Sequence, residues 1–230
     1  MKKSMVIGFL SFLLVGCSNY STVVKAHQND VAEFKIRPIE SAKPTANKTF
    51  RITSFIFEEN AMPGNPEFVK TNTLILPFLV FDYWNHQTQY ILGKNQFKAQ
   101  LEIDLKNAFE IGLSQFGYRI SESNPDFEVT IKARKCISKS TYTKSGFFYF
   151  ALVAYGYNFG GSRGPYESQV ILDIETKRGG SSYNSEIEGS AALPFKLFRD
   201  DTDSEIERIN RSLAISINEA VAKYAMVAPK

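Results

Sequence analysis

Few side chains in this sequence are of the kinds that carry out catalysis. The 230 residues include two histidines and two cysteines. His86 follows Asp82 in the segment FDYWNHQTQY, and a histidine–carboxylate pair supports catalysis when it orients a nucleophile. The run Gly160–Gly164 reads GGSRG and matches G-x-S-x-G in its letters, but it lacks the strand-to-turn-to-helix context of a nucleophile elbow, and the sequence has no cysteine-based active-site signature. We therefore expect His86 to be a surface loop residue and the protein not to be an enzyme.

Other groups of polar residues predict structural roles. Asp200, Asp201 and Asp203 precede a helical pattern, and carboxylates at that place cap the first turn and offset the helix dipole. The glycine-rich run 160–164 lacks the lysine and the strand-to-helix context of a phosphate-binding loop, so it predicts a flexible turn. His27 and the other histidine lie far apart with no cysteine cluster beside them. We expect neither a metal site nor a cofactor.

The N-terminus predicts a lipid attachment site. Lys2 and Lys3 precede the apolar run Met5–Val15, which has the order of a secretory signal and is shorter than the roughly 20 residues of a membrane span. Leu14-Val15-Gly16-Cys17 then resembles the lipobox of bacterial lipoproteins. This resemblance implies that the Cys17 thiol takes a diacylglycerol, that the chain is cut before it, and that fatty acids such as palmitate acylate the new amino group. The alternative is an ordinary signal peptide or a buried helix, with the cysteine present by chance.

The lipid anchor predicts where the protein lies. Acyl chains contribute about 0.8 kcal/mol per buried methylene, so two or three of them hold a domain firmly on a membrane. Ser18 replaces the aspartate that would resemble an inner-membrane retention signal, which favours the outer membrane of the bacterial cell envelope. With Cys17 modified, no intramolecular disulfide is possible, and we expect Cys136 to be a small buried apolar residue.

Composition excludes several other classes of protein. Apolar residues make up 43% of the chain and charged residues 22%, as in globular proteins rather than disordered tails or multi-span membrane proteins. The formal net charge is +3, and it falls to about +1 when Lys2 and Lys3 leave with the signal. A balance this small does not suggest binding to nucleic acid.

The chain divides into three parts. We expect residues 1–16 to be the signal peptide, 17–48 to be the acylated cysteine and a flexible tether, and 49–226 to form one domain. The tether is polar and contains Pro38 and Pro44. Phe34, Ile36 and Ile39 would let part of it dock as an edge strand.

Periodicity predicts an α+β fold for this domain. Apolar residues recur every three to four positions over Phe97–Phe116 and Ile206–Tyr224, which predicts two amphipathic helices. Alternation over Phe127–Arg134 predicts a strand with one buried face, and Phe50–Phe57 predicts another strand. Val170–Leu193 alternates on both sides of an Arg-Gly-Gly turn, as a β-hairpin does. We expect an antiparallel sheet with both helices packed on one face.

The order of these elements resembles a group of envelope lipoproteins. A helix ending in Phe-Gly-Tyr-Arg is followed by the segment PDFEVTI, the hairpin VILDIETKRGGSSYNSEIEGSA and a helix ending in Ala-Lys-Tyr. Behind a lipobox, this order resembles the YajG-type family of uncharacterised outer-membrane lipoproteins over roughly residues 97–224. The resemblance implies a small α+β accessory of envelope assembly or transport. Residues 50–96 and the aromatic segment near residue 150 depart from the pattern, so it implies no role for them.

Two apolar stretches have neither strand alternation nor a polar helix face. They read LILPFLVFDYW at 74–84 and FFYFALVAYGY at 147–157. One interpretation is that they are covered core elements. The other is an aromatic surface that meets a protein, a glycan or the membrane, because aromatic side chains are enriched at such interfaces. The candidate interface residues are Trp84, Tyr149, Tyr155 and Tyr157.

These observations favour a lipid-anchored, non-catalytic envelope protein. It would act as an accessory or binding module for an envelope assembly or transport system, with an unidentified envelope protein as its partner and the membrane bound through Cys17. Two alternatives are a lipoprotein that binds a lipid or glycan, and a subunit of an oligomeric outer-membrane structure. A hydrolase is disfavoured because an acid, a base and a nucleophile cannot be assembled from these residues.

Overall fold

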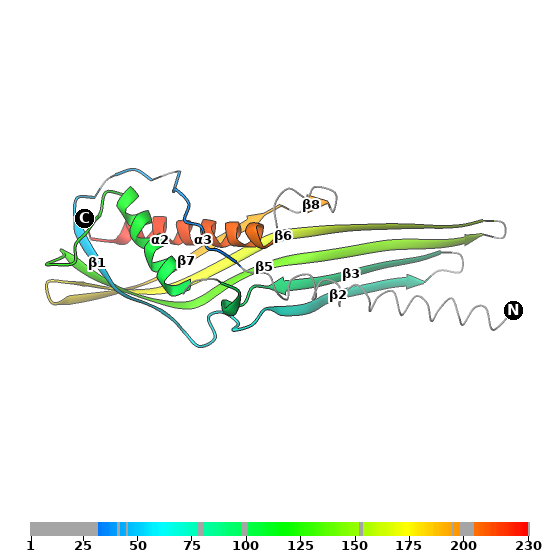
Figure 1. Ribbon diagram of the computed structural model, residues 1–230, viewed down its shortest axis with the longest axis horizontal. Helices are drawn as coiled ribbons and strands as arrows, with labels where there is room; N and C mark the ends of the chain where they lie inside the picture. Colours follow the sequence, from blue (N-terminus) through cyan, green and yellow to red (C-terminus); the bar gives the residue numbers. More distant parts are fainter. Residues whose placement is uncertain are drawn as a thin grey trace.

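The computed structural model describes residues 32–40, 42–44, 46–77, 81–97, 101–151, 154–194, 196–197 and 205–229. Over 71–77, 81–82, 84, 147–151, 154–161 and 196–197 it describes the backbone alone. The elements are β1 (Thr49–Phe57), β2 (Glu67–Pro77), β3 (Phe81–Ile91), the 3-10 helix η1 (Lys94–Gln96), α2 (Leu101–Gln115), β4 (Arg119–Ile120), β5 (Phe127–Ala151), β6 (Ala154–Arg178), β7 (Ser181–Leu193), β8 (Lys196–Leu197) and α3 (Glu205–Val227). The molecule is elongated, with the helices at one end and long strands running side by side towards the other (Figure 1).

The described strands form one mixed sheet. Its main path is β2-β3-β5-β1-β4, and β6 joins it by pairing with β5, β7 and β8. β1 pairs in parallel with β4 and β5, whereas the other pairings between the named strands are antiparallel. The expected α+β class is confirmed, but the expectation of a purely antiparallel sheet is wrong. The connection through α2 is a crossover that returns the chain to the starting end of β1, so β4 and β5 run in the same direction as β1.

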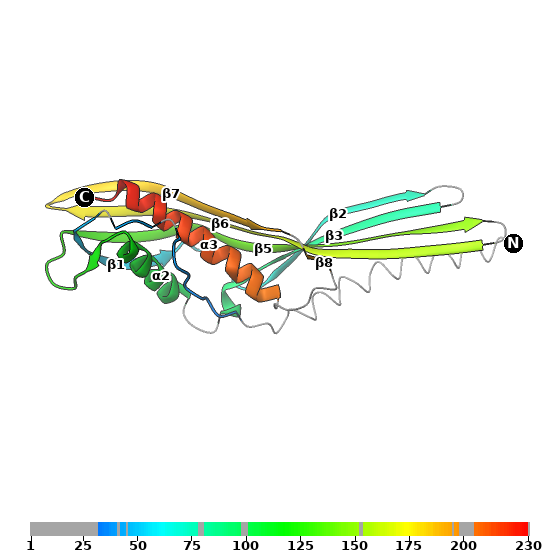
Figure 2. The same cartoon turned by 90° about the horizontal axis from the view of Figure 1, so that it is seen from above.

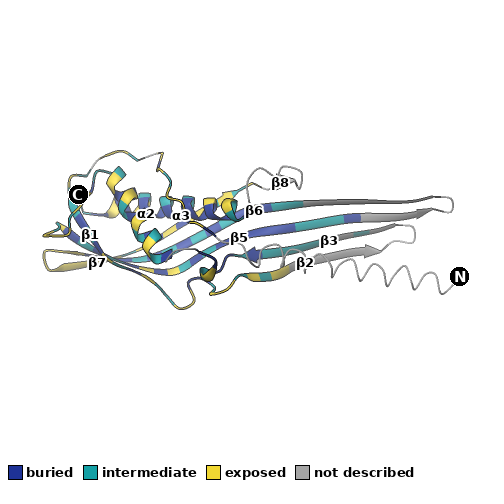
Figure 3. Ribbon diagram, in the orientation of Figure 1, coloured by how far each residue is buried: buried dark blue, intermediate teal, exposed yellow. Residues whose placement is uncertain are grey.

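We call the end of the molecule that contains the helices the body. It comprises β1, β4, β7, α2 and α3 with residues 127–138 of β5 and 167–178 of β6. Here α3 contacts β5, β6, β7 and α2, and α2 also contacts β1. Along β5, Phe127, Val129 and Ile131 are buried, whereas Lys132 and Arg134 are exposed (Figure 3). This is the alternation expected of a strand with one buried face.

Both predicted helices are confirmed, and they pack closely in the body. Phe109 of α2 is fully buried, and its ring centroid lies 5.9 Å from that of Tyr224 of α3. Gly189 of β7 lies against the backbone of α3, where an added Cβ atom would come within 1.9 Å of the Ser216 carbonyl oxygen. A residue without a side chain is therefore needed where this strand meets the helix.

The N-terminal segment lies against the body. Ala32 and Phe34 are buried, and Ile39 is only 9% exposed. The backbone N–H of Ile39 donates to Gln115 Oε1 at 2.7 Å. Ala32 makes an isolated parallel bridge with Phe97, so this segment docks without forming the edge strand that the sequence suggested.

The other end of the molecule is a four-stranded extension that we call the ribbon. It comprises β2, β3, residues 139–151 of β5 and residues 154–166 of β6, and Figure 2 shows it projecting beyond the helices. The predicted hairpin around Gly179 and Gly180 is confirmed, because both residues have positive φ in the turn between β6 and β7.

Two predicted loops are in fact parts of ribbon strands. His86 lies in β3, and residues 160–164 lie in β6. Both segments pair with β5, and this pairing keeps them extended. Glycine and histidine are both compatible with a paired strand. The glycine run instead coincides with a bulge opposite Ser140–Tyr142, where Gly164 has φ of 105°.

Candidate functional site

The two apolar stretches of the sequence meet at the far end of the ribbon. The stretch 74–84 spans the end of β2 and the start of β3, and 147–157 spans the end of β5 and the start of β6. β3 pairs with β5 so that Phe81 lies opposite Tyr149 and Trp84 opposite Gly146. We call the described positions 74–77, 81–84, 147–151 and 154–157 the apolar end. Asp82 is its single charged residue.

The strand register places the four predicted interface residues on this end. Trp84 lies opposite Gly146, Tyr157 opposite Phe148 and Tyr155 opposite Phe150. Because residues two apart on a strand share a face, Trp84, Tyr155 and Tyr157 belong to one face of the ribbon and Tyr149 to the other. The side chains of these four residues lie outside the described part of the structure.

Basic residues lie where the apolar end begins. His86 of β3 is opposite Lys144 of β5, and Lys70 of β2 lies opposite Thr88. These residues occupy the same face of the ribbon as Trp84 by the two-residue period. Burial lowers the pKa of His86, and the positive charges of Lys70 and Lys144 lower it further. We call Lys70, His86 and Lys144 the basic band.

A buried polar cluster joins the ribbon to α3. Glu205, the first residue of α3, accepts a hydrogen bond of 2.7 Å from the Ser140 hydroxyl, and its other carboxylate oxygen lies 3.5 Å from Arg163 Nε. The side chain of Glu205 is 2% exposed. Burial, followed by the Glu205 charge and its hydrogen bond, raises the pKa of Tyr142. No pattern in the sequence predicts this cluster beyond a glutamate at a helix start, since its members are far apart in the chain.

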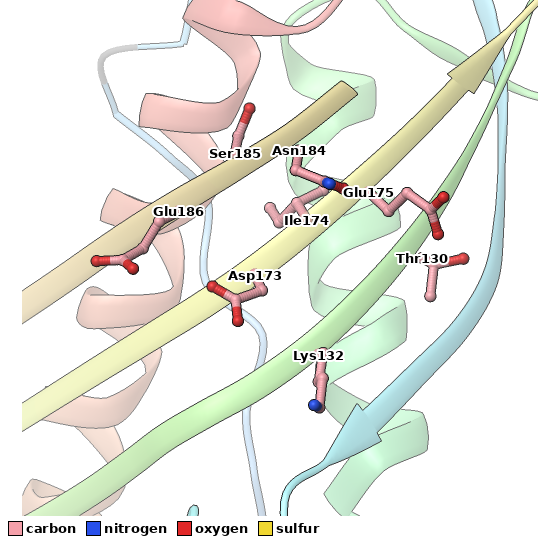
Figure 4. Close-up of a pocket in the computed structure, with 8 residues that line it drawn as sticks. All are labelled: Thr130, Lys132, Asp173, Ile174, Glu175, Asn184, Ser185 and Glu186. Atoms are coloured by element: carbon pink, nitrogen blue, oxygen red, sulfur yellow. The ribbon is translucent and has the colours of Figure 1, made fainter. Parts of the chain in front are cut away.

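A shallow depression lies on the body sheet, on the strand face that carries Lys132. It has a volume of about 450 Å³ and is lined by residues of three neighbouring strands, β5, β6 and β7 (Figure 4), namely Thr130, Lys132, Asp173, Ile174, Glu175, Asn184, Ser185 and Glu186. Lys132 pairs with Glu58 at 2.8 Å, and Arg134 pairs with both Asp173 and Glu186. Because Lys132, Asp173 and Glu186 are already paired with Glu58 and Arg134 beside the depression, it is an ordinary polar sheet surface.

The other residues considered for chemistry do not form a site. Cys136 is fully buried, and burial raises the pKa of its thiol to about 12, which keeps it uncharged and unreactive. Within the described ranges, no group of three or more His, Cys, Asp or Glu residues is placed to hold a metal ion. Cys17, His27, Asp200, Asp201 and Asp203 lie outside the described residues. The apolar end with its basic band is therefore the candidate functional site.

Comparisons with known proteins give no family for this chain. Neither the family models nor the curated proteins that were searched contain a match. A solved structure titled "Crystal structure of uncharacterized protein" aligns with 86% of this chain and 98% of its own, at 9% identity and a TM-score of 0.43. Among the helices that the structure describes, none is both long and apolar enough to cross a membrane.

Proposed function

We propose that this protein is a lipid-anchored, non-catalytic accessory of the bacterial cell envelope that inserts the apolar end of its ribbon into a membrane. The observation that carries this proposal is the meeting of two apolar stretches, remote in sequence, at the tip of one ribbon. An aromatic, nearly uncharged surface of this kind suits the membrane interface. The basic band beneath it suits anionic lipid headgroups, which attract lysine and protonated histidine.

The length of the apolar end limits how deep it can go. From Ser145 to Ala151, strand β5 covers about 20 Å at the usual rise per residue. The hydrocarbon core of a bilayer is about 30 Å thick. The apolar end therefore matches insertion past the middle of the bilayer, with the basic band at the near headgroups and Asp82 as a cost to insertion.

The proposed lipid on Cys17 can reach the same membrane. The backbone N–H of Ala32 donates to the Gln96 carbonyl at 2.7 Å, close to the end of β3 that joins the body. The chain from Cys17 to Ala32 spans at most about 50 Å. Strand β3 is 11 residues long, or about 36 Å. The anchor and the apolar end therefore fit one bilayer surface.

Two other uses of the apolar end compete with insertion, namely binding of a lipid or glycan and docking to an envelope protein. A lipid or glycan carrier would gain support from an enclosed apolar cavity, whereas the depression on the body is shallow, polar and charge-paired. Docking to an envelope protein would use the same aromatic residues in water. The depth of Trp84 in a lipid bilayer distinguishes insertion into the membrane from ligand binding and from protein docking in water.

Trp84 provides the test because it is the single tryptophan of the chain. The acylated full-length protein is reconstituted into vesicles of phosphatidylethanolamine and phosphatidylglycerol that contain lipids brominated near the start or near the end of the acyl chain. Trp84 lies two residues beyond His86, or about 7 Å into the hydrocarbon. We expect strong quenching, greater with the shallow bromines.

The matched control moves the tryptophan to the body. In the double variant Trp84→Phe, Tyr183→Trp, the probe replaces a tyrosine of β7 that is 57% exposed, and the lipid anchor is unchanged. We expect no quenching there. The triple variant Tyr149→Ser, Tyr155→Ser, Tyr157→Ser should reduce quenching of Trp84. Equal quenching of the two probes, or none of Trp84, would refute insertion.

A further inference from the structure

We infer that copies of this chain join side by side in the membrane, with the outer edge of β6 in one copy pairing with the outer edge of β2 in the next. This inference rests on the insertion proposed above. It concerns the backbone edges of the ribbon rather than its faces, and it commits to a second copy of the chain as the partner.

The outer edge of β6 is open only where the ribbon is apolar. β7 pairs with β6 over Tyr166–Arg178, and β8 covers Ser162 and Arg163. Within the described residues, Ala154–Gly161 has a partner in β5 alone. On the opposite border of the ribbon, β2 is paired with β3 alone among the described strands.

Over positions 154–161 of β6 and 73–76 of β2, neither open edge carries the residues that usually prevent strands from joining, since Lys70 and Pro77 of β2 lie outside this stretch. Edge strands in water are commonly protected by lysine, proline or inward-pointing charges. Positions 154–161 of β6 read AYGYNFGG, and positions 73–76 of β2 read TLIL, with the first proline at Pro77. These edges are therefore suited to pairing with a further strand.

Lipid makes such pairing necessary. About half of the backbone N–H and C=O groups of an edge strand point away from the sheet. Hydrocarbon offers them no hydrogen-bond partner, so open sheet edges do not occur in the hydrocarbon region. A single ribbon inserted alone would expose two such edges, one on β2 and one on β6.

Strand direction selects which edges meet. β2 runs from the body towards the tip, and β6 runs from the tip towards the body, because the four ribbon strands are successively antiparallel. Copies anchored in one membrane have their tips at the same end. Pairing β6 with the β2 of a neighbour is then antiparallel, whereas pairing β6 with another β6 would be parallel. The antiparallel contact is head-to-tail, which closes into a ring or continues as a row.

Paired cysteines test this contact in the vesicles described above. Asn158→Cys is placed in the open edge of β6, and single cysteines at Thr73, Leu74, Ile75 and Leu76 are placed in β2 of separate preparations. The native thiols do not interfere, because Cys136 is fully buried and Cys17 carries the proposed lipid. Only cysteines directly opposite on neighbouring strands have the short Cβ separation of a disulfide.

A head-to-tail contact predicts a distinctive pattern. Mixing Asn158→Cys protein with protein carrying a β2 cysteine in the right register should give about tenfold more disulfide dimer than either protein alone. A chain carrying both cysteines should give a ladder of larger species. Tyr183→Cys, on the exposed outer strand of the body, is the control for random collision and should give neither.

The outcomes separate this inference from the proposed function. Dimers of Asn158→Cys with itself, or an absence of mixed dimers at all four β2 positions while Trp84 is quenched, would overturn the head-to-tail contact and leave insertion standing. An absence of Trp84 quenching would refute insertion and the contact together. Protection of Cys136 from alkylation in each variant confirms that the body is folded.

Discussion

The body and the ribbon are built from the same two strands, yet different forces hold them. In the body, β5 and β6 pack one face against α3, and Val129, Ile131 and Leu172 are fully buried. At the base of the ribbon Tyr90 and Tyr142 are still buried, but farther out β5 and β6 continue beyond the helix as backbone ladders beside β2 and β3 (Figure 2). Strand pairing is therefore enough to extend the sheet. Packing of a helix against one face decides which part of the sheet forms a core in water.

This comparison predicts losses of stability that differ in size when the same substitution is made in the two regions. Phe109→Ala in the body removes a fully buried ring that packs against Tyr224, and should lower the free energy of unfolding by about 3–5 kcal/mol. Phe148→Ala at the apolar end should lower it by less than about 1 kcal/mol, because none of the described helices covers that end, so little cavity is left. Urea titration followed by far-ultraviolet circular dichroism measures both.

The same two variants should also differ in Trp84 quenching, and in the opposite order. Phe148→Ala should weaken Trp84 quenching by brominated lipid, whereas Phe109→Ala should leave it unchanged under conditions where the protein remains folded. If Phe148→Ala destabilised the protein in water as strongly as Phe109→Ala, the apolar end would be a packed core. The proposal of membrane insertion would then lose its basis.

A second prediction concerns the close backbone contact between strand β7 and helix α3 in the body. Gly189→Ala would place a Cβ atom 1.9 Å from the Ser216 carbonyl oxygen, so strand β7 or helix α3 must move. We expect a loss of about 2–3 kcal/mol in the free energy of unfolding. Gly64→Ala is the matched control, because nothing lies within 4 Å of its added Cβ atom. Equal melting temperatures for the two variants would contradict the tight packing.

The third prediction concerns the joint between the two regions. Glu205→Gln keeps the shape of the side chain but removes the charge that lies 3.5 Å from Arg163 Nε. Breaking a buried ion pair by changing one partner is destabilising, and the partial exposure of Arg163 reduces the effect here to about 1–2 kcal/mol.

Its control lies two residues further along the same helix. Glu207 pairs with Lys35 at 3.6 Å, and both side chains are well exposed, so Glu207→Gln should change stability by no more than about 0.5 kcal/mol. Hydrogen exchange localises the effect of Glu205→Gln, which should be greatest over residues 162–166 of β6. Uniform acceleration over the body would show that Glu205 stabilises the helix rather than the joint.

The regions also differ in how far their structure follows from the sequence. In the body, alternation in β5 and helical periodicity in α2 and α3 predicted the elements correctly, because each has one buried and one wet face. Alternation does not report strand direction, which is why the parallel pairing of β1 with β5 was missed. In the ribbon, residues 147–157 are apolar at nearly every position, so no period identifies them as strands.

The residues of the candidate site were predicted from the sequence, but their common position in the fold was not. Trp84 and Tyr149 were singled out by composition, whereas their placement at the same end of the ribbon depends on the pairing of β3 with β5, which brings together parts of the chain remote in sequence. The pairing of Arg163 with Glu205 was missed for the same reason. Short-range patterns cannot report such contacts, and a glycine run that suggested a turn concealed the strand that carries Arg163.

The smallest effect we expect is a dependence on pH. Acidification should lower the free energy of unfolding in water, whereas it should favour insertion into anionic vesicles. Burial and the charges of Lys70 and Lys144 lower the pKa of His86 below its usual value of 6.5. As the pH falls through 6.5, the unfolded chain therefore binds a proton on this histidine before the folded chain does, and the free energy of unfolding decreases. His86→Gln should remove this loss between pH 7 and pH 5, measured by urea titration in solution.

On vesicles rich in phosphatidylglycerol, the same proton should favour insertion. Anionic headgroups beside the basic band stabilise the charged imidazole and offset the repulsion from its two lysine neighbours. Trp84 quenching should therefore increase slightly on acidification to pH 5 in the wild-type protein and stay constant in His86→Gln. An increase of equal size in both proteins would mean that another group senses the pH. The basic band would then be a feature of the ribbon in water and not its contact with the membrane.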